Sequence, residues 1–155
     1  VELPQHAWMQ PAGATALSSS LPRSEHLTSL DLRDNRIGGG VSHLAIALPA
    51  CASLTDLNLS ANSIGNEGTA AVATAVPRCS ALQHLHVGSN WIMDEGAECL
   101  AGALRAATSL RTLSLRDNLV TDDGARGLGR AVWANPRLSQ LDLAHNTLIS
   151  DGCVT

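Results

Sequence analysis

Apolar and polar positions alternate in a frame that occurs five times along the chain. Each copy reads Leu-x-x-Leu-x-Leu/Val-x-x-Asn-x-Ile/Leu/Val, as in Leu82, Leu85, Val87, Asn90 and Ile92. The asparagines follow one another at intervals of 27, 28, 28 and 28 residues and stand at Asn35, Asn62, Asn90, Asn118 and Asn146. This period, combined with the leucine frame, predicts structural repeats that stack into a solenoid.

Each repeat is predicted to contain one short strand and one helix. The alternation of Leu113 and Leu115 gives a strand with a single apolar face. A glycine follows each asparagine, at Gly40, Gly68, Gly96, Gly124 and Gly152, and apolar residues recur four and eight places after the first four, a helical spacing. Parallel strands require a long crossover, which the helix supplies. The predicted fold is therefore α/β, a horseshoe segment with parallel strands on the concave face and helices on the convex face.

The five asparagines are interpreted as structural. A polar side chain between apolar ones is costly when it is buried without partners. An amide both donates and accepts hydrogen bonds. We therefore expect each asparagine to satisfy backbone groups of its own repeat and of the next one.

The same register predicts the boundaries of the array. Residues 1–12 are expected to be a degenerate N-terminal segment or partial repeat, residues 13–152 an array of one half repeat, four full repeats and one incomplete repeat, and residues 153–155 a truncated C-terminal end. Solenoids usually carry capping units at their ends, and the sequence suggests a fragment of a longer protein or part of a larger assembly. The loop at Gly38, Gly39 and Gly40 is one residue short, for which a tolerated deletion is favoured over close approach of a partner.

Composition narrows the functional class. The formal charge is −4 and the ten basic residues look scattered along the sequence, which argues against a nucleic-acid surface. No apolar run approaches the roughly 18 residues that span a membrane, so no membrane insertion is expected. Cys51 and Cys79 occupy equivalent positions of adjacent repeats, while Cys99 and Cys153 do not. We expect reduced, half-buried thiols and a cytoplasmic protein, with a cilium or another organelle as alternatives.

No catalytic or cofactor site is predicted. The serines have no local base, and the glycines are periodic because the repeat requires them. His84 and His86 lie on one face of a predicted strand, but Asp56 is their single carboxylate neighbour, and a working zinc site needs three protein ligands. Solvated or partner-contacting histidines are the favoured interpretation, and the chain is not expected to be an enzyme.

Two surfaces are candidates for binding a protein partner. The first is the loop after each asparagine, where Trp91, Met93 and Leu119 place apolar side chains in the middle repeats. An equally weighted alternative is that Trp91 folds over its own loop and covers core leucines. The second is the open face of the strands, where solvation alone is the alternative; its candidates are Asp31, Arg33, Asp56, Asn58, His84, His86, Arg116 and Asp142.

The repeat unit from Ser109 to Gly124 resembles the ribonuclease-inhibitor-like class of leucine-rich repeats, and the resemblance covers residues 13–152. It implies a protein-interaction or scaffold module, with a protein partner in a large assembly such as an axonemal or organellar complex. A second hypothesis is a regulator of the Ran GTPase-activating type, with Arg33 and Arg116 as candidate contacts. A third is the sensor region of an immune-type receptor.

Overall fold

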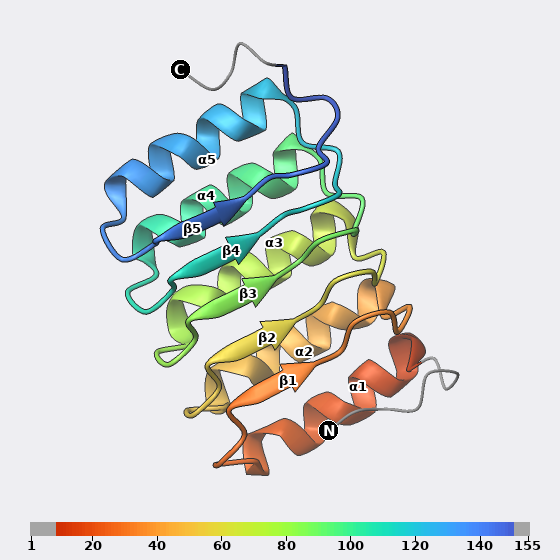
Figure 1. Cartoon of the computed structure of the whole chain (residues 1–155). Helices are drawn as coiled ribbons and strands as arrows, with labels where there is room; N and C mark the ends of the chain where they lie inside the picture. The colour runs from red at the N-terminus through yellow and green to blue at the C-terminus, as the bar shows by residue number, and fades with distance from the viewer. Residues whose placement is uncertain (1–8, 151–155) are drawn as a thin grey trace.

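In the described part of the chain, five strands form one parallel sheet, and five α-helices cover one of its faces. The computed structural model describes residues 9–150. The strands are β1 (Ser29–Asp31), β2 (Asp56–Asn58), β3 (His84–His86), β4 (Thr112–Ser114) and β5 (Gln140–Asp142), and they lie side by side in chain order. The helices are α1 (Gln10–Ser20), α2 (Val41–Ala47), α3 (Gly65–Ala75), α4 (Asp94–Ala106) and α5 (Asp122–Ala134). Figure 1 shows each helix running back behind the sheet to the start of the next strand.

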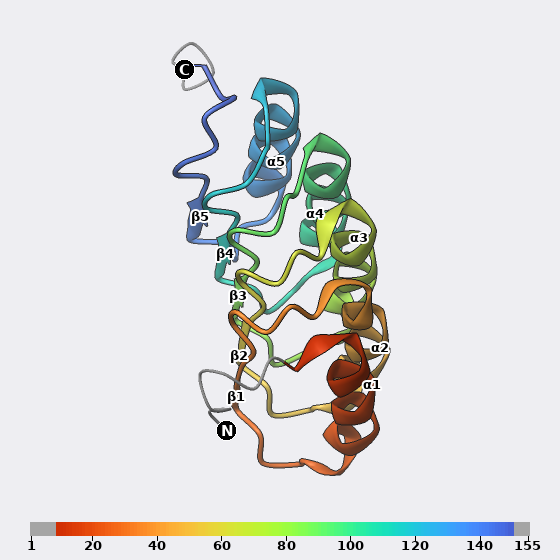
Figure 2. The same cartoon turned by 90° about the vertical axis from the view of Figure 1, so that its right-hand side faces the viewer.

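The sheet and the helices form two curved layers. Figure 2 shows the strands on the inner side of the bend and the helices on the outer side, as the sequence predicts. Neighbouring strands pair in the register of the repeat, so that Leu57 lies beside Leu85 and Leu85 beside Leu113. These three leucines are buried, whereas the residues on either side of each in its strand are partly open to solvent. The fold is thus an α/β solenoid whose core is a stack of equivalent leucines between the two layers.

Helix length follows from proline placement. The helices α1, α2 and α3 each pass into a short 3₁₀ turn, at Leu21–Arg23, Leu48–Ala50 and Val76–Arg78, and each turn has proline as its second residue. Proline has no N–H to continue the helical ladder. The helices α4 and α5 lack this proline and run for 13 residues each. A further 3₁₀ turn, Gly38–Gly40, occupies the shortened glycine loop.

The periodic glycines lie where neighbouring helices meet. A Cβ atom on Gly68 would stand 2.7 Å from Cγ1 of Val41 in α2, and one on Gly40 would stand 2.7 Å from the Cα atom of Pro11 in α1. The helices α3, α4 and α5 begin two or three residues before their glycines, whereas α2 begins directly after Gly40. Because α1 already begins at Gln10, residues 10–12 of the segment expected to be degenerate are helical. Residues 1–8, together with Gly152 and residues 153–155, lie outside the described residues.

The asparagine ladder joins each repeat to the one before it. Oδ1 of Asn62 accepts hydrogen bonds from the backbone N–H groups of Asn35 at 2.9 Å and Ile37 at 3.3 Å. Its Nδ2 donates to the carbonyl oxygens of Leu32 and Leu59. The expectation that the side chain reaches the next repeat is wrong in direction, because the amide lies against the loop of the preceding repeat and accepts from two backbone N–H groups there. The Oδ1 atoms of Asn90, Asn118 and Asn146 likewise accept from backbone N–H groups of the preceding repeat.

A second set of cross-repeat bonds, missed in the sequence, lies at the helix starts. Oδ1 of Asp94 accepts from the backbone N–H groups of Thr121 at 2.8 Å and Gly124 at 3.1 Å, and Oδ2 accepts from the Thr121 hydroxyl at 2.6 Å. Oδ1 of Asn66 accepts from the N–H of Met93 at 2.8 Å. Burial by itself would raise the pKa of Asp94. The three hydrogen bonds together lower the pKa by more, so that it lies below the ordinary value. The carboxylate therefore ties two repeats together.

The thiols are more deeply buried than the sequence suggests. Cys51 and Cys79 are buried rather than half-buried, and the Cys79 Sγ donates to the carbonyl oxygen of Ala75. Burial, with a smaller contribution from Cys51 and an opposing one from Arg78, raises the pKa of Cys79 to about 11. Cys99 is exposed, and all three are free thiols. Cys51 and Cys79 thus act as small core residues.

Candidate functional site

The loops that follow the asparagines form one edge of the solenoid, called here the asparagine rim. The backbone on either side of the asparagine takes the left-handed conformation in the first three repeats, with φ of 52° at Arg36, 53° at Ser63 and 61° at Trp91. The left-handed conformation costs roughly 1–2 kcal/mol per residue when the residue is not glycine. Leu119, the equivalent residue of the fourth repeat, does not adopt it. The local backbone conformation therefore does not favour tryptophan at position 91.

Packing does not account for Trp91 either. Its side chain is 65% exposed, so it does not fold back over the core leucines. It lines a shallow hollow of about 160 Å³ together with Leu119, Ser89, Asp117 and Asn118. The Ser89 hydroxyl donates to Asp117 at 2.8 Å, which fixes the polar side of the hollow. The indole is thus available to a partner at the most apolar part of this rim.

Met93 lies near this hollow in sequence but is not part of its lining. Its side chain is 47% exposed, and its backbone N–H is bound by Asn66. Of the three rim residues expected to cluster, the structure brings Trp91 and Leu119 together in one hollow and leaves Met93, the residue that precedes α4, outside it. The core of the candidate site is therefore a pair rather than a triad.

Several candidates on the open sheet face hold the backbone at the strand ends. Oδ1 of Asp31 accepts from the N–H of Arg33, Oδ1 of Asn58 from the N–H of Ser60, and Oδ1 of Asp142 from the N–H of Ala144, each at 3.0 Å. These bonds turn the chain out of the strand. These backbone bonds are enough to explain a polar side chain at the last position of each strand, without contact to a partner protein.

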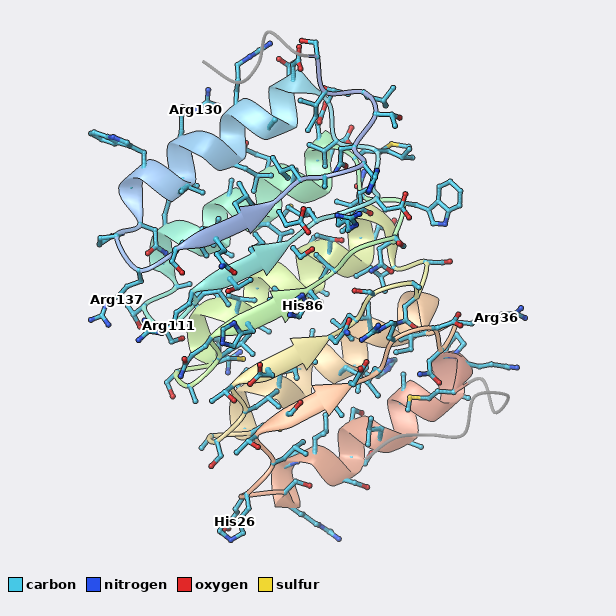
Figure 3. The ribbon with its side chains drawn as sticks, viewed as in Figure 1. His26, Arg36, His86, Arg111, Arg130 and Arg137 are labelled. Atoms are coloured by element: carbon cyan, nitrogen blue, oxygen red, sulfur yellow. The ribbon has the colours of Figure 1, made fainter. Side chains whose placement is uncertain are left out.

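The two histidines of the sheet face are the freest of these candidates, because within the described residues their rings form no hydrogen bond. Asp56 lies beside His84 in the strand register and accepts a hydrogen bond from the Thr55 hydroxyl. His86 lines a polar hollow of about 330 Å³ with Arg33 and Arg116 among its walls, and Figure 3 shows His86 on the open face of β3. Within residues 9–150 no group of three His, Cys, Asp or Glu side chains lies close enough to hold a metal ion. The hollow is suited to hydrogen bonding with a polar partner.

The two arginines of this face are already engaged. The Arg33 guanidinium pairs with Asp31 at 3.2 Å, and the Arg116 guanidinium contacts the His145 ring. Both side chains belong to exposed residues. Each guanidinium therefore already has a partner on this face.

Two exposed hydrophobic residues on the helix layer were missed. Trp133 in α5 is 92% exposed, and Ile46 in α2 is 78% exposed. The four-and-eight spacing identifies the buried positions of each helix. Ile46 and Trp133 fall outside those positions, so the spacing could have predicted that they are exposed. No helix in the described part of the chain is both long and apolar enough to cross a membrane.

Comparison with known proteins gives the family. A model described as Leucine Rich repeat matches residues 23–40, 50–73, 78–101 and 106–129, more than half of the chain. A comparison with curated protein sequences gave no match.

Solved structures share the fold at low sequence identity. Leiomodin-1 actin-binding site 2 superposes with a TM-score of 0.76 and 14% identity, over 81% of this chain and 76% of that one. The tropomodulin C-terminal domain of Caenorhabditis elegans superposes with a TM-score of 0.76 and 12% identity, over 90% of this chain and 86% of that one. These structures share the solenoid fold, and the four segments matched by the family model show that the chain belongs to the leucine-rich repeat family.

Proposed function

We propose that this chain is a protein-interaction or scaffold module that docks a protein partner through the asparagine rim at Trp91. The observation that carries the proposal is the exposure of Trp91 in a left-handed backbone position. Neither folding preference nor core packing favours tryptophan there, and tryptophan is enriched among residues that dominate binding energy at interfaces. The adjoining hollow with Leu119 gives a partner side chain a place to insert.

The polar hollow around His86 is proposed to supply the specific contacts. It lies on the concave face, which solenoids commonly use for partners. Arg33 and Arg116 supply donors to this hollow, whereas the hydroxyls of Ser89 and Ser114, which already donate to Asp117 and Asp142, present acceptor lone pairs. A partner that spans from Trp91 onto this face would combine an apolar anchor with polar recognition.

The setting is proposed to be a larger cytoplasmic assembly. Two buried, unpaired thiols, Cys51 and Cys79, are typical of a reducing compartment. The leiomodin-1 region that shares this fold is named for binding actin, which makes actin one reasonable protein to include among the candidates. The GTPase-activating alternative has less support, because Arg33 is held by Asp31 and Arg116 contacts His145.

The test compares two exposed tryptophans. Wild-type, Trp91→Ala and Trp133→Ala proteins are used as baits for affinity purification with quantitative mass spectrometry. We expect Trp91→Ala to deplete a partner that Trp133→Ala retains, because Trp133 stands on the helix layer away from the rim. Both changes are at exposed positions and should alter the free energy of unfolding by about 1 kcal/mol or less.

Two results would contradict the proposal. One is a partner set that is unchanged by Trp91→Ala. The other is a large fall in melting temperature for Trp91→Ala with binding intact, which would make Trp91 a packing residue.

A further inference from the structure

The arginines are not scattered once the chain is folded. All ten basic residues are arginine, and five of them lie in or beside the segments that lead from a helix to the next strand. We call this set the arginine rim; it consists of Arg23, Arg78, Arg105, Arg111 and Arg137. Because the strands are parallel, these segments meet at one edge of the solenoid, opposite the asparagine rim. Figure 3 shows Arg111 and Arg137 at the edge where the strands begin, and Arg36 at the other edge.

The arginine rim has almost no negative charge of its own. Among the helix-to-strand segments of the described residues, the single carboxylate is Glu25. The ion pairs within residues 9–150 involve Arg33 and Arg126, and none involves a member of the arginine rim. All five side chains belong to exposed residues. The rim therefore presents guanidinium groups without internal partners.

The helix dipole explains part of this arrangement. Arg23, Arg78 and Arg105 lie in the last turns of helical segments, where a positive charge is favourable. Arg111 precedes β4, and Arg137 lies between α5 and β5, so both are outside any helix. The dipole does not account for these two arginines.

Hydrogen bonds within one loop and between repeats fix the backbone that carries these two arginines. The N–H of Arg137 donates to Oδ1 of Asn135 at 2.9 Å, and the buried Asn135 amide donates to the carbonyl oxygens of Leu104 at 2.6 Å and Ala107 at 3.1 Å. The Ser139 hydroxyl donates to the carbonyl oxygen of Arg111 at 3.1 Å. These bonds set the relative positions of the two loops before any ligand arrives, which reduces the entropy lost on binding.

We propose that the arginine rim docks an acidic segment of a protein partner, with Arg111 and Arg137 as the principal contacts. The guanidinium fork matches a carboxylate in two parallel hydrogen bonds, and a rim built from arginine alone favours that geometry. Adjacent strands are spaced by about 4.8 Å. Arg78, Arg111 and Arg137 precede the consecutive strands β3, β4 and β5, so that one extended segment can meet all three. This inference rests on the proposed function only in treating the chain as a protein-binding module.

Charge balance favours a short acidic segment over a long polyanion. The rim has five arginines against one carboxylate, whereas the rest of the sequence has five arginines against thirteen carboxylates. A nucleic acid or an anionic membrane would extend beyond the rim and meet this negative remainder. A segment of a few glutamates or aspartates lies within the rim.

The test measures direct binding of a fluorescein-labelled, glutamate-rich peptide by fluorescence anisotropy at low salt, with the matched glutamine peptide as the uncharged control. Arg111→Gln/Arg137→Gln should weaken glutamate-peptide binding about tenfold, from two lost charge pairs. Arg36→Gln/Arg130→Gln makes the same change of net charge outside the rim and should alter the affinity less than about twofold. Circular dichroism verifies that both variants are folded. Affinity should fall as salt is raised.

Several outcomes would overturn the inference. They are no binding of the glutamate peptide by the folded wild-type protein, an equal loss in the two double variants, or tighter binding of an oligonucleotide or of phosphatidylserine vesicles that depends on Arg111 and Arg137. Failure here leaves the Trp91 test untouched, because that test reads out the opposite rim. A chain that keeps its Trp91-dependent partner but ignores the peptide would refute the arginine rim alone.

Discussion

Replacing Asn62 by alanine should show how strongly the asparagine ladder stabilises the solenoid. The side chain is fully buried and takes part in five hydrogen bonds. The three carbonyl groups that it binds each keep another donor after the change: Leu32 keeps the amide of Asn35, Leu59 the amide of Asn90, and Ser60 the backbone N–H of Asp34. The loss therefore falls on the two N–H groups that Oδ1 now satisfies.

The magnitude follows from those two donors. A buried donor left without a partner costs about 1–3 kcal/mol, so stranding the N–H groups of Asn35 and Ile37 should lower the free energy of unfolding by about 2–6 kcal/mol. Oδ1 of Asn146 accepts from one backbone group, Val120. Asn146→Ala should therefore cost about half as much. Ser63→Ala, at the exposed neighbouring position, should change the stability by about 0.5 kcal/mol or less.

Urea unfolding followed by circular dichroism measures all three variants. A loss below about 1 kcal/mol for Asn62→Ala would refute the view that stranded donors set the cost. So would a larger loss for Asn146→Ala than for Asn62→Ala, since the order is fixed by how many donors each side chain satisfies.

Two further predictions concern the helix layer and the helix starts. Gly68→Ala should destabilise the protein by about 1–3 kcal/mol, because the new Cβ would stand 2.7 Å from Val41. Gly129→Ala has open space at its Cβ and should stabilise the protein by about 0.5–1 kcal/mol. Equal effects of the two changes in thermal unfolding would contradict the close helix contact. The lowered pKa of Asp94 means that its ionised form favours the folded state, so its contribution is complete above the ordinary value of 3.8 and is lost as the pH falls through the folded value. Asp94→Asn, which keeps an acceptor for Thr121 and Gly124, should flatten the fall of stability in acid, and an unchanged acid limb would rule out this carboxylate as a contributor.

Local rules made the repeat predictable. The buried face of each strand follows from the period-two alternation at residues such as Leu113 and Leu115, and the helix from the four-and-eight spacing after Gly96. Acidic residues before the glycines mark helix starts, as Asp94 and Asp122 do. These features depend on neighbours within one repeat, which is why the sequence was sufficient for the fold.

Relations between repeats were harder to predict. The direction of the asparagine bonds and the Asp94 bonds to Thr121 depend on how far one strand is offset from the next. Trp91 was found as a candidate because it departs from the periodic pattern, but its 65% exposure depends on the path of its loop. Asp31 and Asn58, chosen as binding residues, turned out to bind their own backbone, a bond that residue type alone does not distinguish from solvation.

The sequence by itself determined that this protein is a stack of equivalent strand-and-helix units with a buried leucine line, because a repeated hydrophobic period admits one way of burying its apolar face. Only the tertiary structure decided which side chains share a surface. Stacking places residues about one repeat apart side by side. Arg111 and Arg137, which β4 and α5 separate in the sequence, therefore reach one edge of the solenoid. Trp91 was brought beside Leu119 for the same reason. Charge and exposure are properties of that assembled surface, and the repeat period alone does not specify them.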